Sequence, residues 1–333
     1  MLPWLQSRTP PLYLAPMAGV TDFVFRGLCR ELGADVMVTE FVSAEGILQQ
    51  DQRTRRYTLF SDQQRPVGVQ LFGADPGRLG EAARKVIDWK QPDFIDINFG
   101  CPVKKVVSRN GGSSLLKDCP LLTAVAEGIV RAVGDQLPVT AKIRIGWDQQ
   151  HINAVDVCRR LEDVGVQAIA IHGRTRAQGY SGEANWDVIG ECAAAVSVPV
   201  IGNGDLAEPR QIADRIASSG VAGAMIGRAA MQNPWLFAAA RAELEGRPQP
   251  AGPSDEERWQ FILRHVRLAI EWGRYGDERC TLQSMRSRLM AYSRGLHRGK
   301  QLRVQFSGVT SVAGLEDIAA AHLAGESLVA EAA

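Results

Sequence analysis

Residues 198–228 read VPVIGNGDLAEPRQIADRIASSGVAGAMIGR and carry the pattern of a strand, a helix and a second strand. Two apolar runs, 198–201 and 223–226, flank a helical pattern that begins at Pro209 and extends to residue 218. Each run ends in glycine and polar residues, Gly202-Asn203-Gly204-Asp205 after the first and Gly227-Arg228 after the second. Strands that are joined through a helix lie parallel in one sheet. The segment therefore predicts a parallel sheet whose strands end in polar turns at one edge.

The same alternation extends back to the start of the chain. Further apolar runs at 12–15, 35–39, 67–72, 94–97, 139–143 and 168–171 are followed by helical patterns at 22–32, 76–89, 120–133, 154–164 and 185–195. Eight such alternations predict an α/β protein of the (β/α)8 TIM-barrel class. A doubly wound sheet is the alternative, but it normally has a Gly-x-Gly-x-x-Gly turn after its first strand, and residues 15–19 read APMAG.

A change in composition divides the chain after the last barrel helix, which we expect at 234–244. Residues 246–253 read GRPQPAGP and cannot sustain a helix or a sheet. Beyond them, Ser254 followed by acidic residues is typical of a capped helix start. We predict a barrel domain at 1–245 and a small all-helical domain at 254–333.

The bulk composition is that of a soluble globular protein, with 45% hydrophobic and 23% charged residues. No apolar run is long enough to span a membrane, and the first eight residues are too polar for a secretory signal, so we expect a cytoplasmic protein. The six cysteines form no Cys-x-x-Cys pair and no ligand cluster with the five scattered histidines. We therefore expect no metal site.

Positive charge is concentrated near the C-terminus although the net charge is only +1. Residues 281–305 contain no acid and six cations, which are Arg286, Arg288, Arg294, Arg298, Lys300 and Arg303. A charge run of this kind is often just a solvated helix face. It also fits an anionic partner such as a nucleic acid.

Polar residues stand where the predicted barrel strands end, which is where barrel enzymes build their sites. The turns containing Gly204 and Gly227, together with Arg228, follow the last two strands, the usual location of a phosphate site. Lys142 and His172 interrupt apolar strands and therefore need partners. The negative charge of a reduced flavin would supply one. Gln70 can donate and accept hydrogen bonds at once, as the edge of a flavin or a uracil requires.

Cys101 occupies the turn after the fourth predicted strand. Most unpaired cysteines are small buried hydrophobes, which suffices for Cys29, Cys158 and Cys192 on predicted helices. At the end of a barrel strand a cysteine can instead be a nucleophile or a proton donor. No adjacent base is evident for a nucleophile.

Seven segments in this order resemble the bacterial tRNA-dihydrouridine synthase family. They are LAPMAGVTD (14–22), VQLFG (69–73), DINFGCP (96–102), AKIR (141–144), IHGRT (171–175), GNGD (202–205) and IGRAA (226–230). The resemblance covers the whole predicted barrel and, more loosely, the helical C-terminal part. It implies an FMN enzyme that reduces uridines in the D-loop of tRNA and takes its electrons from NADPH.

The resemblance also implies roles for individual residues. Hydride would pass from flavin N5 to uracil C6, with Cys101 giving a proton to C5. The uracil and the tRNA would be held by Asn98, Arg144, Arg174, Arg286 and Arg288, the last two in a tRNA-docking helical domain. FMN would be held by Pro16, Met17, Ala18, Gln70, Lys142, His172, Asn203, Gly204, Asp205, Gly227 and Arg228.

Several points stay open in the sequence. Residues 111–118 and 39–42 resemble the type that acts on position 16 of tRNA, whereas residues 103–106 resemble another bacterial type, so the modified uridine is not assigned. An FMN barrel acting on a free pyrimidine, as in dihydroorotate dehydrogenase, is the alternative enzyme. A tRNA-binding protein without catalysis is the alternative from another class. We expect a monomer, although the sequence does not determine the oligomeric state.

Overall fold

Eight parallel strands close into a barrel in the computed structural model, which describes residues 2–102 and 111–326. The ring closes because β9 pairs with β1 as well as with β8, with Leu14 opposite Ile226. This pairing excludes the doubly wound sheet and confirms the predicted (β/α)8 class. In ring order the strands are β1 (Leu12–Leu14), β2 (Val36–Val38), β4 (Val67–Phe72), β5 (Phe94–Asn98), β6 (Val139–Arg144), β7 (Ala168–His172), β8 (Val200–Asn203) and β9 (Gly223–Ile226).

All eight predicted strands are present, with ends that shift by one or two residues. A short additional strand, β3 (Val42–Ser43), pairs alongside the end of β4. It does not enlarge the ring, because β2 pairs directly with β4. The 103–106 motif, which resembles a different bacterial type, lies outside the described residues.

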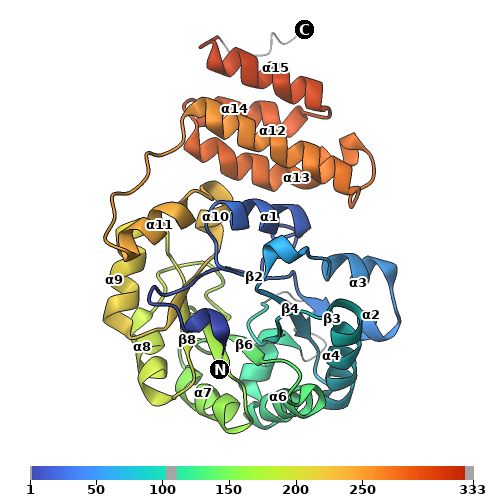
Figure 1. Ribbon diagram of the computed structural model, residues 1–333, viewed down its shortest axis with the longest axis vertical. Helices are drawn as coiled ribbons and strands as arrows, with labels where there is room; N and C mark the ends of the chain where they lie inside the picture. Colours follow the sequence, from blue (N-terminus) through green and yellow to red (C-terminus); the bar gives the residue numbers. More distant parts are fainter. Residues whose placement is uncertain (1, 103–110, 327–333) are drawn as a thin grey trace.

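Helices surround the barrel (Figure 1), and the predicted ones are confirmed. Asp22, Asp75, Asp118 and Asn185 cap four of them with a side-chain oxygen that accepts a backbone N–H in the first turn. The seven predicted barrel helices are α1 (Phe23–Glu31), α4 (Pro76–Lys90), α6 (Cys119–Val133), α7 (Ala154–Asp163), α8 (Trp186–Ala195), α9 (Pro209–Ser219) and α11 (Leu236–Leu244). Three short α-helices of the described residues were not predicted from the sequence: α2 (Ala44–Leu48), α3 (Gln52–Tyr57) and α10 (Arg228–Gln232).

The amino end of the barrel is filled with side chains. Trp4 closes this end by donating a hydrogen bond to the Tyr13 hydroxyl at 2.7 Å and packing on Phe94, with ring centroids 5.1 Å apart. Val36, Val38, Ala170, Ile201 and Met225 complete this interior cluster. The large cavity of the described residues therefore lies toward the carboxyl ends of the strands.

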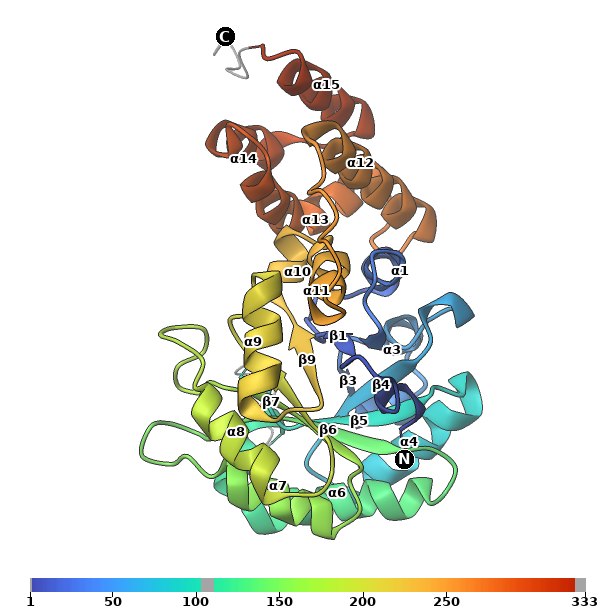
Figure 2. The same ribbon diagram turned by 60° about the vertical axis from the view of Figure 1, so that its left-hand side comes forward.

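Four α-helices of the described residues follow the barrel and lie over one part of it. They are α12 (Asp255–Trp272), α13 (Glu278–Tyr292), α14 (Gly299–Gly308) and α15 (Val312–Leu323), and we call them the C-terminal helices. Figure 2 shows them stacked beyond α1, α10 and α11. Ser254 and Glu257 form a reciprocal capping box at the start of α12, as the sequence predicted. The division into domains at 1–245 and 254–333 remains a prediction. Among the described helices, none combines the length and the apolar character that a membrane span needs.

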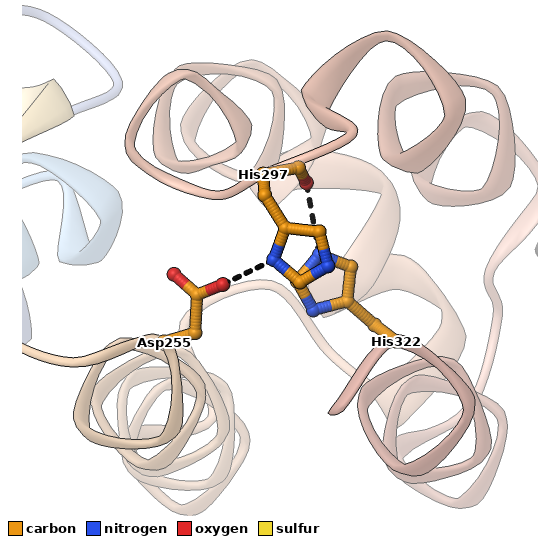
Figure 3. A group of neighbouring side chains, drawn as sticks. All are labelled: Asp255, His297 and His322. Atoms are coloured by element: carbon orange, nitrogen blue, oxygen red, sulfur yellow. Dashed lines mark hydrogen bonds and ion pairs between the residues drawn. The ribbon is translucent and has the colours of Figure 1, made fainter. Parts of the chain in front are cut away.

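Two of the histidines that are scattered in the sequence meet among the C-terminal helices, which the sequence analysis did not expect. The rings of His297 and His322 lie 3.9 Å apart between centroids, and Asp255 bonds to Nδ1 of His297 (Figure 3). His322 Nδ1 accepts from the Trp259 indole at 3.0 Å, and its Nε2 lies 2.9 Å from the His297 carbonyl oxygen. Both nitrogens of His322 are thus engaged in joining α12, α15 and the loop before α14. The expected lack of a metal site stays a prediction.

Candidate active site

A cavity of about 1090 Å³ opens at the carboxyl ends of the strands. It is lined by residues from the barrel and from the C-terminal helices, so its wall has two parts. Fourteen of the residues singled out in the sequence line it: Pro16, Met17, Ala18, Gln70, Asn98, Cys101, Lys142, Arg144, His172, Asn203, Gly204, Asp205, Gly227 and Arg228. The sequence therefore predicted cavity residues on, or directly after, every strand of the ring except β2.

Cys101 lies in the cavity wall in a turn that Asn98 holds. The Asn98 side-chain oxygen accepts the backbone N–H groups of Gly100 at 3.0 Å and Cys101 at 2.9 Å. On the other side, the Cys101 carbonyl oxygen accepts from the backbone and the hydroxyl of Ser113. Cys101 is only 6% exposed although it lines the cavity. Its sulfur is thus attached to a turn that is fixed at both ends.

A chain of buried amides leads from this turn to an acid that the sequence analysis missed. Asn98 donates to the Gln70 oxygen at 2.7 Å, and Gln70 donates to Asp96 at 2.6 Å. Thr140 donates to the other Asp96 oxygen at 2.6 Å. Burial raises the pKa of Asp96, although these donors oppose the shift. Each amide keeps a second N–H or lone pair, so Gln70 and Asn98 can still bind a ligand in the cavity.

Cations from the neighbouring strand β6 lie next to this network, with Lys142 beside Asn98 in register and Arg144 donating to the Gly100 carbonyl at 2.9 Å. Lys142 donates to the Asn203 side chain at 3.3 Å. Burial lowers the pKa of Lys142 to about 8, and the neighbouring charge of Arg144 acts in the same direction. Burial also lowers the pKa of His172 to about 2, with Lys142 and Arg144 adding to the effect. His172 is therefore neutral at physiological pH, whereas Lys142 is largely charged.

Asp205 organises the turn after β8. Its carboxylate pairs with Arg174 at 2.7 Å and with Arg228 at 3.1 Å, and it also accepts the backbone N–H of Ala184. Burial alone would raise the pKa of Asp205, but these donors and charges lower it. Gly204 precedes it with φ of +131°, and a Cβ there would lie 2.5 Å from that of Ala184. Only glycine fits this position, which keeps the backbone close to the cavity.

Two residues expected to bind substrate, Arg174 and Arg288, do not line the cavity, and their assigned roles stay predictions. Arg174 is 2% exposed and is held by Asp205 and by the carbonyls of Ser181 and Gly182, outside the cavity lining. Arg288 is fully buried in an ion pair with Asp22 at 2.9 Å. Neither guanidinium is accessible to a nucleic acid. Arg286 is exposed but does not line the cavity.

Other residues of the wall were not singled out as site residues in the sequence. Tyr180 is 57% exposed, and the Arg228 guanidinium lies 4.7 Å from its ring centroid. Arg294 and Arg303 line the cavity from the C-terminal helices, beside Met290. The two arginines belong to the cationic run at 281–305, but nothing in that run distinguishes them from Arg288. Tyr180 follows the RTRAQG turn, where no periodic pattern predicts which side chains face the site.

Comparison with known proteins identifies the group to which this site belongs. The family model described as "Dihydrouridine synthase (Dus)" matches residues 13–326, nearly the whole chain. The chain belongs to the dihydrouridine synthase family. The resemblance expected from the seven segments is thereby confirmed.

Relatives within this family are similar over most of their length. A Pseudomonas aeruginosa protein named "tRNA-dihydrouridine synthase B" is 40% identical over 297 residues, which is 89% of this chain and 87% of the relative. A Rickettsia conorii protein named "Probable tRNA-dihydrouridine synthase" is 37% identical over 88% of this chain and 87% of its own. Among solved structures, histamine dehydrogenase from Rhizobium sp. 4-9 has a TM-score of 0.54 at 16% identity, covering 72% of this chain and 47% of that one. That likeness supports the barrel fold alone.

Proposed function

We propose that this protein is a tRNA-dihydrouridine synthase that binds FMN in the barrel cavity and uses NADPH as its reductant. One observation carries the proposal: the 40% identity, over nearly nine-tenths of the chain, to a relative of that name. The cavity supports it, because a reactive cysteine position, a cationic side and a second wall of helices meet there. A tRNA substrate also implies a cytoplasmic location.

The residues of the cavity fit an anionic cofactor. Lys142, Arg144 and Arg228 face the cavity, where Asp205 is the acidic residue in the lining. The pKa of Lys142 is lowered by burial, which means that its charge is poorly compensated in the ligand-free protein. A phosphate near Gly204 and Arg228, and the flavin ring near Lys142 once it is reduced, would supply the missing negative charge. Pro16, Met17 and Ala18 provide the facing wall.

The division of chemical roles follows from where the groups lie. The bound flavin supplies the hydride. Lys142 carries the positive charge that stabilises electron density beside it, and neutral His172 can donate one hydrogen bond without adding charge. Cys101 Sγ donates the proton to uracil C5 and regains one from water. Asn98 keeps the Cys101 turn in place and, with Arg144, orients the uracil.

The second wall of the cavity supports a macromolecular substrate. Arg294 and Arg303 line the mouth of the cavity. Arg286 is exposed on α13, the helix that also carries lining residues. The phosphate backbone of a tRNA can therefore bind outside the cavity while one base enters it. Extruding a base from its stack costs a few kcal/mol, which such contacts offset. An enzyme acting on a free pyrimidine does not need cations there.

The names of the relatives indicate which type of tRNA-dihydrouridine synthase this chain resembles. Three of the similar Pseudomonas proteins are named as type B, at 38–42% identity. We propose that this chain is of the same type, in preference to the position-16 type suggested by residues 39–42 and 111–118. The uridine that it modifies stays unassigned.

The proposal is tested with purified, flavin-loaded protein and two substrates. We expect NADPH and unmodified tRNA to yield dihydrouridine, measured by nucleoside mass spectrometry, and free orotate or uracil to remain unchanged. Reduction of the free pyrimidine without reaction on tRNA would favour the dihydroorotate dehydrogenase-like alternative. A colourless protein that binds tRNA and reduces neither would favour the non-catalytic one.

A further inference from the structure

The backbone N–H and the backbone carbonyl of Gly19 are both hydrogen-bonded by groups that connect this residue to the C-terminal helices. Its N–H donates to Glu40 at 2.6 Å, and Glu40 forms a two-pronged ion pair with Arg274. Its carbonyl accepts from Arg288 at 2.6 Å. Arg274 lies in the loop between α12 and α13, and Arg288 lies on α13. One residue of the barrel is thus bonded directly by Arg288 and, through Glu40, by Arg274.

The ion pairs behind these contacts are buried, although Gly19 itself is exposed. The side chains of Arg274 and Glu40 are 8% and 2% exposed, and those of Arg288 and Asp22 are both fully buried. Tyr275 donates to Asp22 at 3.0 Å and accepts from Arg288 at 2.9 Å. A buried ion pair is costly to separate because each charge is then left without water or a partner. The buried pairs therefore connect the Gly19 backbone to Arg274 and Arg288.

Gly19 belongs to a tight turn in which Met17, Ala18 and Val20 line the cavity. The Met17 carbonyl accepts the N–H groups of Val20 and Thr21, both at 3.0 Å, and the Met17 N–H donates to the Thr21 hydroxyl at 2.8 Å. These bonds make residues 17–21 a compact unit. Met17 and Ala18 line the cavity, so a displacement of Gly19 changes the wall that they form.

The same helix that holds Gly19 also faces the mouth of the cavity. Ser287, Met290 and Ala291 of α13 line the cavity, and Ser287 is the direct neighbour of Arg288. A large ligand bound at this mouth would contact the helix whose Arg288 bonds the Gly19 carbonyl. The path from the outer wall to the 16–18 wall therefore passes through Arg288 and the backbone of Gly19.

We propose that Glu40, Arg274 and Arg288 are positioning residues that couple binding at the outer mouth to the affinity of the cavity for its flavin. This inference rests on the proposed function for the identity of the two ligands. By linkage, tRNA binding tightens FMN binding, and FMN tightens tRNA binding by the same factor. A purely structural clamp would hold the fold together but would leave the two affinities independent.

The test measures the dissociation constant of FMN from flavin fluorescence, with and without a saturating unmodified tRNA transcript. In the parent protein we expect tRNA to lower this constant at least about fivefold, the lower end of typical couplings. The double variant Glu40→Gln/Arg274→Met keeps an acceptor for the Gly19 N–H but loses the ion pair to the C-terminal helices. Its FMN affinity without tRNA should stay within about twofold of the parent, and its coupling should fall below about twofold.

Arg264→Met is the matched control. Arg264 on α12 also joins the C-terminal helices to the barrel, through Glu31 on α1, but this pair is about half exposed and does not touch the Gly19 turn. It should keep the coupling of the parent. If the double variant does not fold, Tyr275→Phe, which removes one oxygen beside Arg288, is measured in its place. It should also reduce the coupling.

Two results would overturn the inference: no effect of tRNA on FMN affinity in the parent, or full coupling in the variant that replaces Glu40 and Arg274. Dihydrouridine formation by a parent without coupling would reject this inference and leave the proposed function intact. A parent that neither binds nor modifies tRNA would contradict both.

Discussion

Asn98 fixes the backbone of Cys101, because its side-chain oxygen accepts the Cys101 N–H at 2.9 Å while its amide donates to Gln70 at 2.7 Å. The residue expected to bind substrate thus also builds the turn that carries the expected proton donor. The position of the cysteine depends on a network that extends over Gln70 to Asp96.

Replacing Asn98 by alanine should therefore destabilise the protein. The N–H groups of Gly100 and Cys101 and the Gln70 oxygen would lose their partner, and a buried unpaired polar group costs about 1–3 kcal/mol. We expect the free energy of unfolding in urea to fall by about 2 kcal/mol or more. An unchanged urea midpoint would show that water replaces the amide and that Asn98 does not hold the turn.

The lowered pKa of Lys142 predicts how FMN binding depends on pH. In the ligand-free protein Lys142 loses its proton as the pH rises through about 8. An anionic ligand favours the charged form, so FMN binding above this pH must take up a proton, and the affinity should fall roughly tenfold between pH 7 and pH 9. Fluorescence titration measures this dependence. Lys142→Gln should bind FMN more weakly, and its affinity should not fall between pH 7 and pH 9. If the affinity of this variant still falls with pH, another group causes the pH dependence.

The burial of Arg288 predicts a structural defect when it is replaced. Removing one partner of a buried ion pair costs about 3–5 kcal/mol, so Arg288→Met should lower the free energy of unfolding by that amount. Arg264→Met, which breaks an exposed pair with Glu31, should cost less than about 1 kcal/mol. Urea denaturation of both variants decides the point. Equal small losses would mean that the Asp22 pair contributes little.

The arginines at the cavity mouth should determine the salt dependence of tRNA binding. Arg294→Gln and Arg303→Gln should each weaken binding and lower the slope of log K against log salt by about 1, as expected for one lost phosphate contact. Arg131→Gln is the control, because Arg131 is an exposed cation in the last turn of α6, at the other end of the barrel. A slope that decreases equally in all three would indicate a general effect of net charge.

The strands and the cavity lining could be predicted because, in a barrel, the residue at the end of each strand has a known place in the structure. Each strand is an apolar run that ends in polar residues, and parallel strands in a closed ring bring those ends together. Asn98 and Lys142 are far apart in sequence but neighbours in register, and so are Arg144 and His172. The order of the runs was enough to place them.

The orientation of the cationic run could not be predicted in the same way. Arg286 and Arg288 are two residues apart on α13, which turns them to opposite sides of the helix. Arg286 is exposed and Arg288 is buried against Asp22. A count of charges does not show which side of a helix each residue faces, so this difference could not be predicted. Asp96 was missed for a related reason: its partners Gln70 and Thr140 come from the two neighbouring strands. Cross-strand pairing is not visible in a single strand.

The most direct test of the account is the dihydrouridine content of tRNA from cells that lack this gene and carry either the parent gene or the variant Cys101→Ala. We expect the parent to restore at least one dihydrouridine and the variant to restore almost none, since losing a proton donor costs about 10²–10⁴ in rate. The purified Cys101→Ala variant should keep its bound flavin and its affinity for tRNA. The control variant is Cys280→Ala, because Cys280 is an exposed cysteine on α13, and it should keep flavin, tRNA affinity and activity. Full restoration by Cys101→Ala, or no change in dihydrouridine on losing the gene, would contradict the account.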